Sequence, residues 1–193
     1  MTLEHRLTRQ FRLGTVCLLA AATVGCGKTE RPEASAGQYG ELQKRLAEYE
    51  VLHKRLADSA GTLDETRSQT DIALRATALA KAITTARADA KQGDIFTPEA
   101  SIAIVNLIKM EYKSRPPMVR EKREDSQEEL PDLVPHVNEQ YPTTYPLATF
   151  PPSLLPRLPK LPDALEYRIV THYLILRDIE SNVIIDFLPH AVP

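Results

Sequence analysis

The sequence lacks tryptophan and has only two cysteines and seven glycines among its 193 residues. Both cysteines, Cys17 and Cys26, lie near the N-terminus, so residues 27–193 offer no disulfide, no catalytic thiol and no cysteine-based zinc site. The glycines match no dinucleotide fingerprint, phosphate loop or nucleophile elbow. These absences exclude thiol catalysis beyond the N-terminal segment and disfavour the common cofactor enzymes.

The chain also lacks a large excess of either charge. Its formal net charge is -2, and residues 26–193 carry about -4, because residues 1–25 hold three arginines and one glutamate. Nucleic-acid binding shows in a sequence as a basic patch or a high isoelectric point. We therefore expect no nucleic-acid partner.

The N-terminal segment has the pattern of an export signal. Arg6, Arg9 and Arg12 precede a stretch from Leu13 to Gly25 that contains no charged residue. A helix that spans a bilayer needs roughly 20 apolar residues, so this stretch is too short to remain in a membrane. A basic region followed by a short apolar one is typical of a signal peptide. We predict that residues 1–25 are a signal peptide and that the protein is exported to the bacterial envelope or periplasm.

The apolar stretch ends in Thr-Val-Gly-Cys at Cys26, which resembles the lipobox of bacterial lipoproteins, although Thr23 stands where leucine is usual. The resemblance implies that Cys26 carries lipid and anchors the protein to the inner or outer membrane. The polar residues 26–37 suit a flexible tether. The alternative is simple secretion, with cleavage after Ala36, which follows the small-x-small rule.

Residues 38–112 are predicted to be helical. Apolar or small residues recur at alternating spacings of four and three over residues 42–60, which indicates a heptad seam of the coiled-coil type. A second seam over residues 72–90 is out of phase with the first, and Thr62 and Glu65 have the spacing of a capping box. We predict two helices in an antiparallel helical hairpin, with one long rod as the alternative.

A third helix is predicted from Pro98 to about Tyr112. Thr97 is a typical N-cap, proline suits the first helical position, and Glu99 places an acid in the first turn. The run that follows is rich in β-branched residues, and its periodicity also fits a buried strand. The capping residues favour the helix.

Proline dominates the next segment, since 11 of the 15 prolines fall within residues 113–162. Regular structure does not persist through such a stretch, so we predict a charged linker and then an extended segment along the folded domain. Within residues 163–193, alternating apolar residues predict a small antiparallel sheet of two or three strands packed on the helices. The strands are expected at Leu165–Val170, Tyr173–Arg177 and Val183–Leu188. The fold class is therefore α+β.

No pattern of residues specifies a reaction, and we predict no catalytic residue, no metal site and no cofactor. The histidines are scattered, and His53 on the first seam is expected to be a packed or half-exposed side chain. Asp178 and Asp186 stand in an otherwise apolar sheet and are the candidates for ligand contact. Their structural interpretation is a turn residue that bonds its own backbone for Asp178 and a position on the exposed sheet face for Asp186.

Three stretches resemble a family of exported bacterial proteins of unknown function. They are KQGDIFTPE at residues 91–99, YPLATFPPSLLPRLPKLPDALEYRIV at residues 145–170 and LILRDIESNVIIDFLP at residues 174–189. The resemblance implies export but no particular activity.

Three functions remain in competition. The first is a non-catalytic, membrane-tethered lipoprotein that serves as a structural or interaction module for a protein partner in the envelope. The second is a periplasmic module that binds a small ligand or a metal, based on Asp178, Asp186 and the histidines. The third is a hydrolase whose carboxylates converge only in the fold, because spaced carboxylates leave no linear motif. We expect the first.

Overall fold

The structure is a computed structural model that describes residues 36–61, 68–116, 133–143, 145 and 150–192. The predicted signal peptide, the predicted lipid-bearing Cys26 and most of the predicted tether lie outside these residues. Their assignment therefore stays a prediction.

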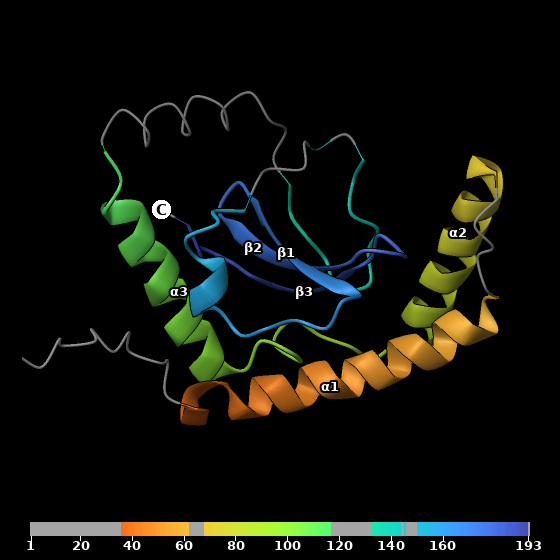
Figure 1. Ribbon diagram of the computed structural model, residues 1–193, viewed down its shortest axis with the longest axis horizontal. Helices are drawn as coiled ribbons and strands as arrows, with labels where there is room; N and C mark the ends of the chain where they lie inside the picture. Colours follow the sequence, from red (N-terminus) through yellow and green to blue (C-terminus); the bar gives the residue numbers. More distant parts are fainter. Residues whose placement is uncertain (1–35, 62–67, 117–132, 144, 146–149, 193) are drawn as a thin grey trace, which may run out of the picture. The chain divides into compact units, whose positions relative to one another are not determined.

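The described residues form three α-helices, one short 3-10 turn and three β-strands (Figure 1). In chain order they are α1 (Ala36–Ser59), α2 (Gln69–Ala86), α3 (Pro98–Lys113), the 3-10 turn (Leu155–Arg157), β1 (Leu165–Val170), β2 (Tyr173–Asp178) and β3 (Ile184–Leu188). The strands make one antiparallel sheet in the order β1-β2-β3. The predicted α+β fold class with a small C-terminal sheet is confirmed.

Helix α1 carries the first predicted seam on its buried face. Leu42, Leu46, Tyr49 and His53 are all buried, because their spacing places them on one stripe of the helix. The helix begins at Ala36, so the last residues of the predicted tether are helical.

Helix α2 begins at Gln69, directly after its N-cap Ser68. The Ser68 side chain accepts a hydrogen bond from the backbone N–H of Asp71. The backbone of Ser68 is extended, so the helix does not continue toward the N-terminus. The predicted start at Thr62, with Glu65 completing the capping box, lies outside the described residues. The helix ends at Ala86, earlier than the second seam suggested.

The two halves of α2 differ in burial. Its C-terminal half packs through Leu79, Ala80 and Ile83, which are buried. Every residue from Ser68 to Leu74 is exposed, and in Figure 1 this half of the helix rises at a steep angle to α1. The predicted second seam is therefore used for packing along only part of its length.

Helix α3 and the strands match the prediction closely. Thr97 is the N-cap of α3, its side chain accepts from the N–H of Ala100, and Pro98 is the first helical residue. The three strands differ from the predicted ranges by one residue at most. These elements are specified by local signals, namely capping residues and an alternation of apolar side chains.

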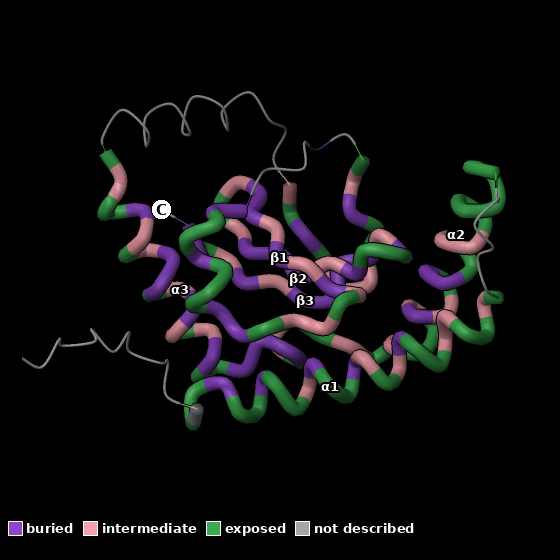
Figure 2. The backbone as a smooth tube through the Cα atoms, viewed as in Figure 1, coloured by how far each residue is buried: buried purple, intermediate pink, exposed green. Residues whose placement is uncertain are grey.

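The sheet is buried on both faces, whereas one buried face was predicted. One face joins the main core with the three helices, and includes Leu174, Leu176 and Ile185. The other face forms a second cluster, in which Tyr141 and Tyr145 cover the strands. In Figure 2 the strands are mostly purple, which marks buried residues. Burying each aliphatic side chain fully stabilises the folded state by about 1.5–3 kcal/mol relative to leaving it exposed.

The Pro-rich segment lies along the domain where it is described, as predicted. Phe150, Leu154 and Leu158 join the main core. At the other sheet face, Gln140 forms an isolated antiparallel bridge with Val183 beside β3. This segment therefore supplies the covering layer that the strand pattern alone did not indicate.

Candidate functional site

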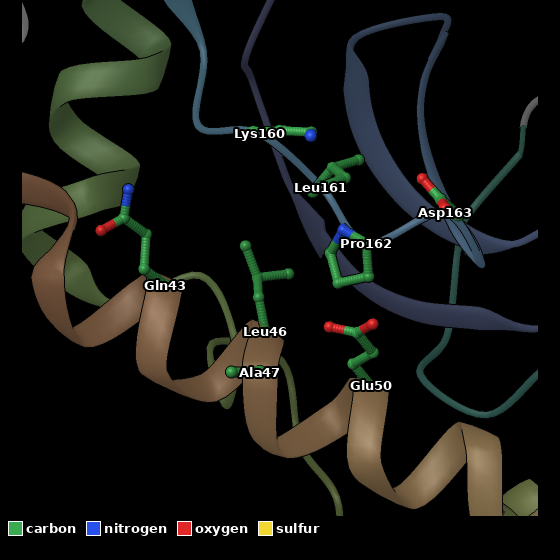
Figure 3. Close-up of a pocket in the computed structure, with 8 residues that line it drawn as sticks. All are labelled: Gln43, Leu46, Ala47, Glu50, Lys160, Leu161, Pro162 and Asp163. Carbon is green, nitrogen blue, oxygen red and sulfur yellow. The ribbon is translucent and has the colours of Figure 1, made fainter.

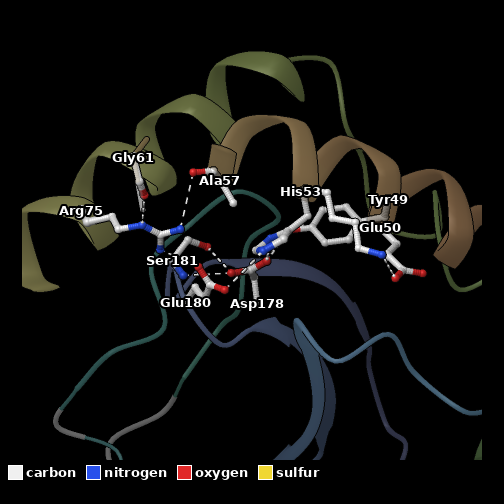
Figure 4. Close-up of polar contacts among 10 residues, drawn as sticks. Tyr49, Glu50, His53, Ala57, Gly61, Arg75, Asp178, Glu180 and Ser181 are labelled. Carbon is white, nitrogen blue, oxygen red and sulfur yellow. Dashed lines mark hydrogen bonds and ion pairs between the residues drawn. The ribbon is translucent and has the colours of Figure 1, made fainter. Parts of the chain in front are cut away.

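Asp178, at the end of β2, is a carboxylate in the buried interior and is 0% exposed. Its Oδ2 accepts a hydrogen bond of 2.8 Å from the Tyr49 hydroxyl and lies 2.7 Å from Nδ1 of His53. Its Oδ1 accepts from both the backbone N–H and the hydroxyl of Ser181, each at 2.8 Å. Figure 4 shows these groups converging between α1 and the turn after β2.

Two of these groups come from one face of α1. Tyr49 and His53 are four residues apart, so their side chains project from the same side of the helix, and each is 4% exposed. The contact of His53 with Asp178 has the distance of an ion pair but not the alignment of a hydrogen bond from the ring N–H. Nε2 of His53 lies 3.7 Å from Oε1 of Glu180. Both ring nitrogens of the buried imidazole therefore face carboxylates.

The electrostatics favour the charged pair. Burial alone raises the pKa of Asp178, but the contacts from His53, Ser181 and Tyr49 outweigh it and hold this pKa below its usual value. The contact with Asp178 raises the pKa of His53, with a smaller contribution from Glu180, while burial opposes the rise. Burial raises the pKa of Tyr49, so its hydroxyl stays a donor. The pKa changes of His53 and Asp178 therefore each favour the charged form of the group, so their contact stabilises an imidazolium beside a carboxylate inside the domain.

An outer ion pair extends this cluster to α2. Arg75 lies 2.6 Å from Oε2 of Glu180, and its Nε donates to the carbonyl of Gly61 at 2.7 Å. Another nitrogen of the same guanidinium donates to the carbonyl of Ala57 at 3.5 Å. One arginine therefore ties α2 both to the C-terminal end of α1 and to the β2–β3 turn (Figure 4).

Asp186 on β3 forms a second buried anchor, also 0% exposed. It accepts hydrogen bonds from the backbone N–H groups of Gly93 and Ile95, both at 2.9 Å, and from those of Phe96 and Phe187, both at 2.8 Å. Burial raises the pKa of Asp186, and the four N–H donors oppose the rise. The carboxylate thus holds the loop that leads into α3.

The predicted exposed-face position of Asp186 is wrong. The residue lies on β3, where both faces of the sheet are covered, so an alternating position is not a solvated one. Gly93 helps the loop to wrap around the carboxylate, because its φ of 90° lies in the left-handed region that glycine adopts without strain. The Asp178 side chain does accept a hydrogen bond from the backbone N–H of Ser181 in the turn that follows, as the interpretation of Asp178 as a turn residue required.

Arg87 lies between the two anchors. Its guanidinium carbon is 5.4 Å from the centre of the Tyr49 ring, and one of its nitrogens donates to the carbonyl of Ile185 at 3.0 Å. Burial lowers the pKa of Arg87, while nearby Tyr49 and Asp186 oppose the change. A half-buried cation thus offsets part of the negative charge of the two aspartates.

The geometry around His53 is not that of a nucleophilic triad. Such a site needs a hydroxyl at the ring nitrogen that faces away from the aspartate, whereas Nε2 of His53 faces Glu180 and the Ser181 hydroxyl donates to Asp178. Among the described residues, no group of three or more His, Cys, Asp and Glu side chains is placed to hold a metal ion. The chemistry that this arrangement supports is charge pairing and pH-dependent packing.

A shallow depression of about 350 Å³ lies elsewhere, between α1 and the segment before β1 (Figure 3). Its polar lining comes from Gln43, Glu50, Lys160 and Asp163. Glu50 already pairs with Lys54 on the same helix, at 2.5 Å. Asp178 and Asp186 do not line this depression.

Sequence reasoning found both aspartates but not their partners. It placed His53 on the helix seam without linking it to Asp178, and it did not single out Tyr49. A signal was present, because a tyrosine and a histidine four residues apart on an apolar seam require a buried polar partner. The sequence gives no indication of which carboxylate that partner is.

No protein-family model matches the chain, and comparisons with curated proteins and with solved structures find no similar protein. Within the described residues, no helix combines the length and the apolar character that crossing a bilayer requires.

Proposed function

We propose that the protein is a non-catalytic lipoprotein of the bacterial envelope that presents helix α2 to a protein partner. The membrane attachment is supported by the export-signal pattern of residues 1–25 and by the lipobox-like sequence at Cys26. The presentation of α2 is supported by the exposure of its N-terminal half, and this observation carries the proposal.

Large apolar side chains of α2 are exposed. Ile72 is 49% exposed and Leu74 is 64% exposed, in the half of the helix that lacks buried residues. Single exposed apolar residues are ordinary on protein surfaces. A short helix without packing is marginal in water, however, and most helical stability comes from burying an apolar face. A partner that covers this half of α2 supplies the missing burial.

The buried polar cluster supports the same function. Tyr49 and His53 fix α1 to Asp178, and Arg75 fixes α2 to the β2–β3 turn through Glu180. The carboxylates are engaged by groups of the domain itself, so the cluster positions α2 instead of offering a ligand site. A helix held at a defined angle loses less entropy when it binds.

Site-specific crosslinking in cells tests the presentation of α2. A photo-reactive amino acid replaces Leu74 in the tagged full-length chain, and the matched control replaces Val51, which is 71% exposed on α1. We expect a discrete adduct from position 74 and little from position 51. Equal labelling from both positions, or none from either, contradicts the proposal.

Metabolic labelling with a fatty acid tests the anchor. The wild-type chain is expected to incorporate label and to sediment with membranes, whereas Cys26→Ser is expected to do neither. Label that persists in Cys26→Ser, or a wild-type chain recovered intact and soluble from the cytoplasm, contradicts the lipoprotein assignment.

A second candidate function, binding of a small polar ligand, is favoured by the depression beside α1. Its volume lies at the lower end of the range of about 300–1,000 Å³ that is typical of ligand sites, and it offers a lysine and two carboxylates. Calorimetry with envelope glycans and divalent metals tests it, with Lys160→Ala as the matched variant. Heat that is absent, or unchanged in Lys160→Ala, removes this candidate.

A further inference from the structure

The outer face of α2 has a stripe of its own, opposite the buried residues Leu79 and Ile83. Its members are all exposed, and they recur at spacings of three, four, three and four, which aligns them along one side of the helix. They are Asp71, Leu74, Ala78, Lys81 and Thr85.

The order of these residues is self-complementary. A large apolar residue, Leu74, and a small one, Ala78, occupy the middle, and opposite charges lie at an equal spacing on either side. If two such helices meet antiparallel about a two-fold axis, Leu74 of each faces Ala78 of the other. The same register places Asp71 of each copy opposite Lys81 of the other. The ion pair and the apolar contact therefore each form twice, as a two-fold symmetric interface requires.

The charges also select the direction of the helices. A parallel pair in register places Asp71 against Asp71 and Lys81 against Lys81, and like charges at such positions are destabilising. Only the antiparallel arrangement pairs opposite charges at both ends of the stripe. In Figure 2 the N-terminal half of α2 is mostly green, which marks exposed residues.

We infer that the partner of α2 is a second copy of this chain, docked antiparallel through the stripe of Asp71, Leu74, Ala78 and Lys81. This inference rests on the proposed function and names its partner. Helix α2 has 18 residues, so the contact is small compared with specific interfaces, which bury about 1,200–2,000 Å². Confinement of both copies to one membrane raises their effective concentration and offsets this small area.

The test uses two differently tagged full-length copies expressed in the same cells, with the photo-reactive residue at position 74. We expect an adduct that carries both tags. Lys81→Glu places two acidic pairs across the interface and is expected to lower its yield about tenfold. Adding Asp71→Lys to Lys81→Glu restores opposite charges and is expected to restore the adduct. Lys113→Glu on α3 is the matched control for net charge, and circular dichroism verifies that each variant keeps its helix content.

The outcomes separate this inference from the proposed function. An adduct with another protein and no doubly tagged species overturns the inference and leaves the proposed function standing. No adduct of any kind overturns both. A doubly tagged adduct that Lys81→Glu leaves unchanged, or that the double variant does not restore, shows association through another register and overturns the inference.

Discussion

The two buried aspartates hold the same domain together by different means. Asp186 accepts hydrogen bonds from backbone N–H groups only, whereas Asp178 is bound mainly by the side chains of Tyr49, His53 and Ser181. Backbone donors are fixed by the path of the chain and do not titrate. Side-chain donors can rotate, lose a proton or be substituted. The comparison indicates that the hydrogen bonds of Asp186 fix the path of the chain, whereas the contribution of the Asp178 contacts to stability depends on pH.

Asp186→Ala is expected to have the largest effect. It leaves the buried N–H groups of Ile95 and Phe96 without a partner, and each orphaned donor costs about 1–3 kcal/mol. The free energy of unfolding should fall by about 4 kcal/mol, measured by urea denaturation. Asp186→Asn keeps an acceptor and should recover part of the loss. A change below about 1 kcal/mol in the alanine variant contradicts the backbone anchor.

Asp178→Ala is expected to be less costly, at about 2–3 kcal/mol. The groups that it leaves behind can adjust, because the hydroxyls of Tyr49 and Ser181 can rotate and His53 can become neutral. The same urea experiment measures the change. If Asp178→Ala proves more destabilising than Asp186→Ala, the proposed difference between the two anchors is wrong.

The pH dependence of stability distinguishes the anchors further. The folded-state pKa of His53 is raised from 6.5. The contribution of His53 to the stability of the fold is therefore fully present below pH 6.5 and is lost as the pH rises through the folded pKa. The pKa of Asp178 is lowered from 3.8, so its contribution is present above that value and is lost as the pH falls through the folded pKa.

We therefore expect wild-type stability to decline as the pH rises from 6.5 through the folded pKa of His53, and His53→Gln to flatten that decline. Thermal unfolding between pH 6 and pH 9 measures it, and His136→Gln is the control because His136 lies on the surface. Parallel pH profiles for wild type and His53→Gln exclude the charged imidazole.

Elements with local signals were predictable from the sequence. Thr97 and Pro98 mark the start of α3, and the alternation within residues 165–170 and 184–188 marks two of the strands. The burial of Asp186 was not predictable in the same way. Alternation shows which residues share a sheet face, but a distant segment decides whether that face is covered.

The candidate site was only half predictable for a similar reason. Tyr49 and Asp178 are separated by 129 positions in the chain, and without homologous sequences no local pattern joins them. The depression beside α1 likewise depends on how the segment before β1 meets that helix. Polar contacts between distant elements require the tertiary fold, whereas caps and strands require only near neighbours.

The smallest expected effect belongs to the outermost part of the Asp178 anchor, the pair of Arg75 and Glu180. Exposed ion pairs contribute about 0.2–1 kcal/mol, and the Glu180 side chain is 44% exposed. Arg75→Ala should therefore lower global stability by less than about 1 kcal/mol. It also removes the hydrogen bonds to the carbonyls of Gly61 and Ala57, so its local effect should exceed its global one.

Amide hydrogen exchange measures that local effect. In Arg75→Ala, exchange should accelerate in the N-terminal half of α2 and stay unchanged in α3, because local opening does not require global unfolding. Arg115→Ala is the matched control, since Arg115 pairs with Glu111 away from α2. If α2 exchanges at the wild-type rate in Arg75→Ala, the ion pair does not hold the helix, and its orientation must come from the packing of Leu79 and Ile83 alone.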